Sequence, residues 1–270
     1  MSPGRSVGLE HLSLYAEPVP AFVAAAAAGG ADTVCLSVNH PGVIDSQLRP
    51  EVLAQLDVSN VSVAMGDGFL LRHGGALGDL ERQLDLIVEF GGRMANTCAF
   101  EPDENVRRDP RLIQDLLGEF CRSARAADVD VLIEFTPLSH VPTLAAAVEL
   151  IEQIDEPNLK ILVDTLHLAR AGEGPADIAK VDPALFAYCQ LSDGPGLSRG
   201  LTAYMDEAVF DRALPGTGEF PLEQVLAALP PDIVISAEVP LRTLEQSGVS
   251  PEERARRALE ASRQVLNRAF

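Results

Sequence analysis

The sequence alternates eight times between a short run rich in β-branched residues and a longer stretch rich in Ala and Leu. Such alternation is typical of repeated βα units, whose strands lie parallel in one sheet. No break in composition separates the units, and the GxGxxG turn typical of an open dinucleotide-binding sheet does not follow the first run. We therefore predict a single-domain (β/α)8 TIM barrel over residues 1–270. The predicted strands lie near 8–14, 32–38, 58–64, 93–99, 129–135, 159–164, 185–191 and 232–238, and the predicted helices near 18–29, 48–56, 77–91, 109–127, 143–154, 174–180, 220–229 and 250–268.

The charge and cysteine content restrict the class of partner and the compartment. A formal net charge of −19 argues against nucleic acid or an anionic membrane as a partner. Four cysteines without a CxxC pair fit a reduced cytosolic protein better than a disulfide scaffold. The start, MSPGRSVGLEHLSLY, lacks the features of a signal peptide, and no apolar run reaches the roughly 18 residues of a membrane span. We expect a cytoplasmic protein that acts on a small molecule, and the sequence leaves open whether it forms a homo-oligomer.

Four later strands end on a side chain that carries oxygen. The runs VLIE, ILVD, AYCQ and VISAE close on Glu134, Asp164, Gln190 and Glu238. The carboxyl ends of barrel strands form one face, so these side chains can converge there. Three carboxylates in one place would repel each other unless a cation balanced them, and oxygen ligands favour Mg²⁺ or Mn²⁺ over Zn²⁺. The pattern predicts a metal site, although Asp164 could instead be the N-cap of the following helix.

The segment 192–219 is too long for an ordinary βα loop, and long loops in compact domains are commonly functional. It contains Arg212, which could close over a substrate. Alternatively, this arginine could pair with Asp206 or Glu207 on the surface.

Arg72 and His73, in GFLLRHGG after the third predicted strand, could bind a substrate carboxylate or hydroxyl. An exposed Arg-His pair without such a role is the alternative.

The cysteines and lysines are weaker candidates for a catalytic nucleophile. Cys98 and Cys189 fall within strands and are expected to be small buried residues. Lys160 begins its strand, at the opposite end of the barrel from the predicted site, so Schiff-base chemistry lacks its residue.

Five features together resemble the xylose-isomerase-like superfamily of TIM barrels, which contains sugar isomerases, epimerases and related lyases: Glu134, the segment from Asp164 to His167, the QLSD run that starts at Gln190, LPGTGEFPL, and Glu238. The resemblance covers roughly residues 30–240 and is strongest from 130 onward. It implies a metal bound by Glu134, Asp164, the residue at 190 and Glu238, and it implies that the two glutamates also act as acid/base groups. The resemblance further implies that His167 contacts substrate rather than metal. A helix-capping or structural histidine is the alternative.

The sequence departs from the commonest pattern of this superfamily at one ligand, because most members carry His where Gln190 stands. The bacterial 3-dehydroshikimate dehydratases resemble this chain in having Gln there, together with the xQLxD-type run and a later PGxG segment. That similarity keeps a lyase interpretation open.

A metal and two glutamates favour removal of a proton beside a carbonyl, with the metal stabilising the enediolate. One glutamate would remove the proton, and the other glutamate or His167 would return one. We therefore predict a metal-dependent sugar isomerase or epimerase that acts on a keto-sugar, polyol or related hydroxy-carbonyl compound. The alternatives are a dehydratase of the 3-dehydroshikimate type and a non-catalytic barrel that binds sugar or metal. Phosphodiester cleavage would need more His ligands and a basic surface, which this sequence lacks.

Overall fold

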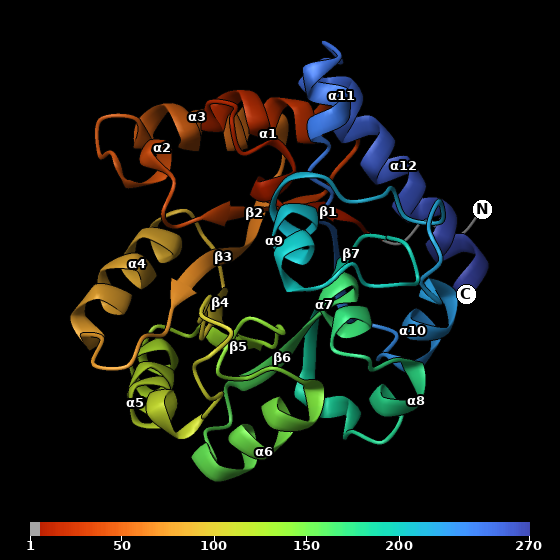
Figure 1. The fold of residues 1–270 in the computed structure, drawn as a ribbon. Helices are drawn as coiled ribbons and strands as arrows, with labels where there is room; N and C mark the ends of the chain where they lie inside the picture. The colour runs from red at the N-terminus through yellow and green to blue at the C-terminus, as the bar shows by residue number, and fades with distance from the viewer. Residues whose placement is uncertain (1–5) are drawn as a thin grey trace.

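The computed structural model describes residues 6–270, and their strands form one closed parallel barrel. Each strand pairs with the next in the sequence, and β8 pairs with β1 to close the ring. Figure 1 shows the strands at the centre and the helices around them. This confirms the predicted (β/α)8 fold; residues 1–5 of the predicted domain lie outside the described range. The strands are β1 (Gly8–Leu9), β2 (Thr33–Ser37), β3 (Ser62–Leu70), β4 (Met94–Cys98), β5 (Asp130–Glu134), β6 (Leu159–Asp164), β7 (Phe186–Leu191) and β8 (Val234–Ala237).

The helices lie mostly around the outside of the barrel, with one of them over its centre (Figure 1). They are α1 (Val19–Ala28), α2 (Pro41–Ile44), α3 (Arg49–Ser59), α4 (Leu77–Glu89), α5 (Arg111–Ala126), α6 (Leu144–Ile154), α7 (Thr165–Arg170), α8 (Pro175–Ile178), α9 (Leu201–Phe210), α10 (Leu222–Ala228), α11 (Arg242–Gln246) and α12 (Pro251–Ala269). α12 packs against α1 and α10, so the last helix lies beside the first (Figure 1). Ser250 caps α12 by accepting a hydrogen bond from the backbone nitrogen of Glu253. No helix within residues 6–270 is both long and apolar enough to cross a membrane.

The predicted element bounds are wrong at the first and third strands. β1 stops at Leu9, and residues His11–Leu14 form a 3₁₀ helix rather than more strand. The β-branched residues near 58 belong to the end of α3, which stops where Asn60 adopts a left-handed conformation with φ 52°. β3 therefore starts later and runs on to Leu70. The helices α2, α7, α9 and α11 lie in segments where the sequence predicts none, and α9 occupies part of the irregular segment 192–219.

A small apolar cluster fills the lumen of the barrel, separate from the main core beneath the helices. Strand side chains alternate between the two faces of a sheet, so a residue two positions further along points to the same side. Glu134, Asp164 and Gln190 each lie two positions after a lumen residue and therefore form the layer above it. The lumen cluster consists of Cys35, Met65, Leu132, Leu162 and Tyr188.

The side chains set aside as nucleophiles lie largely as expected. Lys160 is near the start of β6 and donates a hydrogen bond to the carbonyl oxygen of Ala184 at 3.0 Å. Cys189 is fully buried in β7. Cys98 is a free cysteine at the end of β4 and is partly buried, so it is less enclosed than Cys189.

Candidate metal centre

The strand register brings the four predicted ligands to the same end of the barrel. Asp164 is the last residue of β6 and is directly paired with Gln190 of β7. The backbone nitrogen of Glu238 bonds to the carbonyl oxygen of Leu191 at 3.1 Å, which places this glutamate level with the end of β7. Glu134 closes β5. The carboxyl ends of adjacent parallel strands meet at one rim, so all four side chains belong to the same face.

Direct contacts join these side chains into one buried cluster. Arg212 donates from Nη1 to Oδ2 of Asp164 at 2.7 Å, and its Nη2 lies 2.8 Å from Oε2 of Glu238. The Nε2 atom of His167 lies 3.3 Å from Oε1 of Glu134 and 3.4 Å from Oδ2 of Asp164. Gln190 donates from Nε2 to Oε1 of Glu238 at 3.3 Å. The four predicted ligands are therefore linked, and their role in binding a metal stays a prediction.

Arg212 is inside the molecule, so the alternative that it pairs on the surface is wrong. Its side chain is almost entirely buried, and its Nε donates to the carbonyl oxygen of Ala208 at the end of α9. The two expected surface partners have other arginines. Glu207 pairs with Arg170 and Asp206 pairs with Arg242, each at 2.6 Å.

Asp164 also has the capping role that the sequence left as its alternative. Its Oδ1 accepts hydrogen bonds from the backbone nitrogens of Leu166 at 2.7 Å and His167 at 3.4 Å, which starts α7. Its Oδ2 faces Arg212. Burial alone would raise the pKa of Asp164, but the charges of Arg212 and His167 and the hydrogen bonds outweigh it and hold this pKa at about 2. Asp164 is therefore ionised at neutral pH.

His167 is held from its other side by Tyr204. The hydroxyl of Tyr204, on α9, lies 2.8 Å from Nδ1 of His167 and 2.6 Å from the hydroxyl of Thr136. α9 thus reaches over the ends of β5 and β6 (Figure 1). His167 joins Glu134 and Asp164 in a group whose ligand atoms all lie within 4.8 Å of one another. The geometry therefore allows this histidine to join the two carboxylates as a ligand of an ion, and its contact with a substrate stays a prediction.

Three polar residues of the early strands complete the cluster, and the sequence analysis missed them. Glu10 follows β1, is buried, and accepts a hydrogen bond from the hydroxyl of Tyr188 at 2.7 Å. Asn96 of β4 donates from Nδ2 to Oδ1 of Asp67 at 2.8 Å and to Oε2 of Glu134 at 2.9 Å. Glu10 and Asp67 follow apolar runs as the later ligands do. That signal was present, but the expected third strand ended at residue 64, before Asp67.

The charge balance of the cluster suits a divalent cation. Burial and the charges of Glu134 and Glu10 raise the pKa of Asp67 to about 7. Burial likewise raises the pKa of Glu10, and the pKa of Glu238 rises well above its usual value through burial and nearby carboxylates, in spite of Arg212. The carboxylates thus outnumber the single guanidinium, and a further cation would relieve their repulsion.

An unpartnered oxygen supports the same conclusion. Oε1 of Gln190 is buried, and within residues 6–270 no group forms a hydrogen bond with it. A buried amide oxygen without a partner costs free energy unless a donor or a cation contacts it. An amide oxygen, like the carboxylate oxygens of Glu134, Asp164 and Glu238, is the kind of donor that hard divalent ions prefer, although Glu238 is not among the three residues whose ligand atoms lie within 4.8 Å of one another. The residues present therefore fit such an ion.

Asp193, in the QLSD run, organises the loop that carries the LPGTGEF segment. Its Oδ1 accepts hydrogen bonds from the backbone nitrogens of Gly194 at 2.8 Å and Phe220 at 3.0 Å, and its Oδ2 accepts from those of Gly216 and Gly218 at 2.9 Å each. A Cβ atom on Gly218 would collide with the Asp193 carboxylate and the Gly194 backbone. The two motifs are therefore parts of one loop structure next to Arg212.

Arg72 and His73 lie exposed in the loop after β3. Nδ1 of His73 is 3.5 Å from the carbonyl oxygen of Leu112. Across the part of the chain that the structure describes, no hydrogen bond or ion pair joins either side chain to the buried cluster. Their role in binding a substrate, like that of Arg212, stays a prediction.

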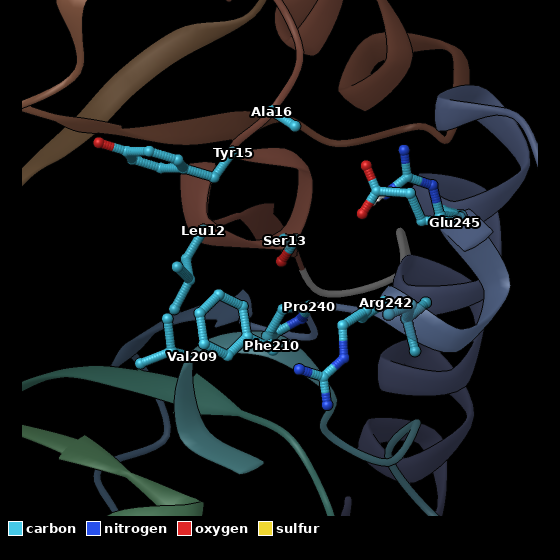
Figure 2. Close-up of a pocket in the computed structure, with 11 residues that line it drawn as sticks. Leu12, Ser13, Tyr15, Ala16, Val209, Phe210, Pro240, Arg242 and Glu245 are labelled. Atoms are coloured by element: carbon cyan, nitrogen blue, oxygen red, sulfur yellow. Dashed lines mark ion pairs between the residues drawn. The ribbon is translucent and has the colours of Figure 1, made fainter. Parts of the chain in front are cut away.

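A pocket of about 430 Å³ is shown in Figure 2, and Arg242 and Glu245 of α11 and Arg254 of α12 form part of its lining. Its wall comes from the residues just after β1, the end of α9 and the residues just after β8; it includes Leu12, Ser13, Val209, Phe210 and Pro240. The same three segments also contain Glu10, Arg212 and Glu238, which belong to the buried cluster. None of these three lines the pocket, so the pocket and the cluster are separate features.

Sequence comparison finds relatives with two kinds of activity. An inosose isomerase of Halalkalibacterium halodurans is 25% identical over 201 residues, which is 69% of this chain and 70% of that protein. A 3-dehydroshikimate dehydratase of Pseudomonas aeruginosa is 28% identical over 154 residues, which is 54% of this chain. The match spans only 23% of the length of the dehydratase.

Structure comparison and a family model agree on the fold. The crystal structure of an IOLI protein with a bound zinc atom has a TM-score of 0.83 at 15% identity and covers 98% of this chain and 99% of that one. The model of the xylose isomerase-like TIM barrel matches residues 22–265. The chain therefore belongs to the xylose isomerase-like TIM barrel family.

Proposed function

We propose that this protein is a divalent-metal-dependent isomerase or epimerase of a small hydroxy-carbonyl compound, such as a keto-sugar or a polyol-derived ketone. The observation that carries the proposal is the buried cluster of Glu134, Asp164 and Glu238 with the unpartnered amide oxygen of Gln190. These four side chains would hold the ion. The similarity to an inosose isomerase over most of both chains supports this class of reaction.

An ion bound there would supply positive charge to substrate oxygens next to the carbon that loses its proton. The protein supplies the proton transfers. Glu134 arrives from β5 and Glu238 from the end of β8, so two carboxylates approach the site from different sides of the barrel. One glutamate can take a proton from carbon while the other returns one. Return to the opposite face of the same carbon inverts its configuration, and return to the next carbon gives an isomer. His167 faces both Glu134 and Asp164 and can hold a substrate oxygen beside them.

The nature of the ion follows from the donors that take part. Four oxygen donors favour Mg²⁺ or Mn²⁺. Participation of His167, which is grouped with Glu134 and Asp164, would favour Zn²⁺ or another transition metal. Titration with each metal separates these two cases.

A dehydratase is the second candidate, and Gln190 keeps it open. This glutamine stands where the dehydratases that the chain resembles also have one, and a dehydratase is among the sequence relatives. The two reactions share the first proton transfer and differ in whether a β-hydroxyl leaves afterwards. Position 190 therefore does not choose between them.

Solvent exchange tests the proposal. The metal-loaded enzyme is incubated in D₂O with a panel of keto-sugars and inososes, and the products are examined by NMR and mass spectrometry. We expect deuterium at the carbon beside the carbonyl without loss of water. Conversion of 3-dehydroshikimate to an ultraviolet-absorbing aromatic product, with no deuterium in the sugars, would reject the isomerase in favour of the lyase. Metal binding without turnover of the sugars or of 3-dehydroshikimate would support a non-catalytic barrel.

The variant Glu238→Gln ties this activity to the site. The amide has nearly the same shape as the carboxylate but cannot take a proton, so we expect turnover to fall at least ~100-fold while the fold is kept. Glu245→Gln, on exposed α11, is the matched control and should keep full turnover. Near-normal turnover of Glu238→Gln would remove this residue from the mechanism.

A further inference from the structure

The amide of Gln190 is held between two carboxylates. Its Nε2 donates to Oε2 of Glu10 and to Oε1 of Glu238, each at 3.3 Å. All three side chains are buried. Oε1 of Gln190 has no hydrogen-bond partner among the described residues. The two ends of one amide group therefore have opposite surroundings.

The neighbours of Gln190 determine which end of the amide points where. Nε2, which belongs to the NH₂ group, is the atom within hydrogen-bond distance of oxygens of Glu10 and Glu238, so the NH₂ end of the amide faces these two residues. Glu10 is itself fixed, because the hydroxyl of Tyr188 donates to its other oxygen, Oε1, at 2.7 Å. Tyr188 is fully buried in β7, two residues before Gln190. This pair of hydrogen bonds locks Glu10 in place and leaves Oε1 of Gln190 free for another contact.

We propose that Glu10 is a positioning residue that orients the amide of Gln190, so that Oε1 rather than Nε2 is presented to a divalent cation. The proposal rests on the metal site proposed above. It adds a function for Glu10, which acts through the proposed metal ligand Gln190 rather than on a substrate.

The need for such a residue follows from the chemistry of the amide. An amide can rotate by half a turn with little change of shape, and the rotated form would point an NH₂ group, which does not ligate, at the cation. A carboxylate on the NH₂ side penalises that rotation, because two oxygens would then face each other. Groups that orient metal ligands typically contribute 10–100-fold to metal affinity.

The first test measures the affinity for Mn²⁺ by calorimetry in a double-mutant cycle of the full chain. We expect Glu10→Leu to weaken Mn²⁺ binding by about 10–100-fold. In a Gln190→Ala background, the same change should have almost no further effect, because no amide remains to be oriented. Glu10→Gln can still accept the hydrogen bond and should stay within a few-fold of the original affinity. An equal loss in both backgrounds would overturn the proposal, since Glu10 would then act on the ion directly or through the fold.

Asp67→Asn is the matched control for loss of a buried carboxylate. Asp67 belongs to the same acidic cluster but bonds to Asn96 and not to Gln190. Its effect on Mn²⁺ affinity should be the same with and without Gln190, whereas that of Glu10 should not. If Glu10→Leu does not fold, Tyr188→Phe removes the donor that fixes Glu10 and should weaken binding in the same direction.

A second measurement needs no metal and separates this proposal from the metal site itself. In the metal-free protein, the two side-chain amide protons of Gln190 should be resolved by NMR and protected from solvent exchange. Glu10→Leu should abolish that protection, and Asp67→Asn should leave it. Protection that survives Glu10→Leu would overturn the positioning role. The amide protons could depend on Glu10 for their protection even if the protein binds no divalent ion. That result would reject the metal site, and it would still show that Glu10 orients the amide.

Discussion

The hydroxyl of Tyr204 and Nδ1 of His167 lie 2.8 Å apart, and this contact sets which nitrogen of the histidine carries the proton. Nε2 faces oxygens of Glu134 and Asp164, and the ionised carboxylate of Asp164 only accepts, so in the neutral ring the proton is on Nε2. Nδ1 must then accept from Tyr204. Burial raises the pKa of Tyr204, which keeps that hydroxyl protonated.

Tyr204→Phe should therefore release the ring of His167 without breaking the fold. We expect turnover to fall about 10–100-fold, as for other groups that orient a functional histidine. Nitrogen NMR of the metal-free protein should show a mixture of the two tautomers of His167 instead of one. Tyr15→Phe serves as the control, because Tyr15 is partly exposed and contacts His40 rather than the cluster. A single unchanged tautomer in Tyr204→Phe would contradict this role.

The sequence was sufficient to predict the barrel because the pattern of a strand followed by a helix is repeated along it. Eight strand-helix units with the same order leave few folds open, and one wrong boundary does not change the count. The four predicted ligands were found for a related reason: each ends an apolar run, and the barrel brings strand ends together.

The missed parts of the site depend on contacts that no local pattern encodes. Glu10 follows a strand of only two residues, and Asp67 lies beyond the predicted end of its strand. The position of Arg212 depends on how α9 folds back over the barrel, which places a guanidinium between two strand ends 48 and 26 positions away along the chain. Sequence spacing gives no indication of this. An arginine in a long loop has the same local sequence whether it is buried or exposed.

Arg212 should matter most when no metal is bound. Its guanidinium pairs with Asp164 and with Glu238 in a buried site, and breaking a buried ion pair typically costs about 3–5 kcal/mol. We expect Arg212→Met to lower the free energy of unfolding by that amount in EDTA. Added Mn²⁺ should recover part of it, because the ion would bind the exposed pair of carboxylates and stabilise the native state. Thermal unfolding with and without Mn²⁺ measures both effects.

Arg242→Met is the control for Arg212→Met, since Arg242 forms a similar bidentate pair with Asp206 at the surface. Surface pairs contribute about 0–1 kcal/mol, so its loss should be small and insensitive to Mn²⁺. Equal losses for the two variants, or a loss at Arg212 that Mn²⁺ leaves unchanged, would show that Arg212 acts only through packing.

Gly218→Ala should disrupt the loop that Asp193 organises. The added methyl group would collide with that carboxylate and with the Gly194 backbone, and it would break hydrogen bonds of buried groups that cost about 1–3 kcal/mol when left unmade. We expect a loss of stability of at least that size in urea unfolding. Gly78→Ala is the opposite case, because Gly78 lies in α4 and an added Cβ would meet only the end of the Arg82 side chain, at 3.8 Å. That variant should gain about 0.4–1 kcal/mol, and a neutral Gly218→Ala would show that the loop tolerates a side chain.

The burial of His11 in the neutral form leads to a prediction of how the stability of the protein depends on pH. It is buried against Phe22, and its Nδ1 accepts a hydrogen bond from the backbone nitrogen of Ser37 at 3.2 Å, which requires the neutral ring. Burial, with a smaller contribution from His40, lowers the pKa of His11 to about 3.

The unfolded chain therefore binds a proton at His11 near pH 6.5, while the folded protein does so only near pH 3. The stability that this difference contributes is complete above pH 6.5 and is lost as the pH falls toward 3. Between pH 7.5 and 5 the loss should be about 2 kcal/mol, since each pKa unit corresponds to about 1.4 kcal/mol. His11→Asn keeps an acceptor for Ser37 but does not titrate, so its stability should fall by about 2 kcal/mol less over this range. Urea unfolding at the two pH values measures this difference, and parallel losses in both proteins would show that His11 is not the group responsible.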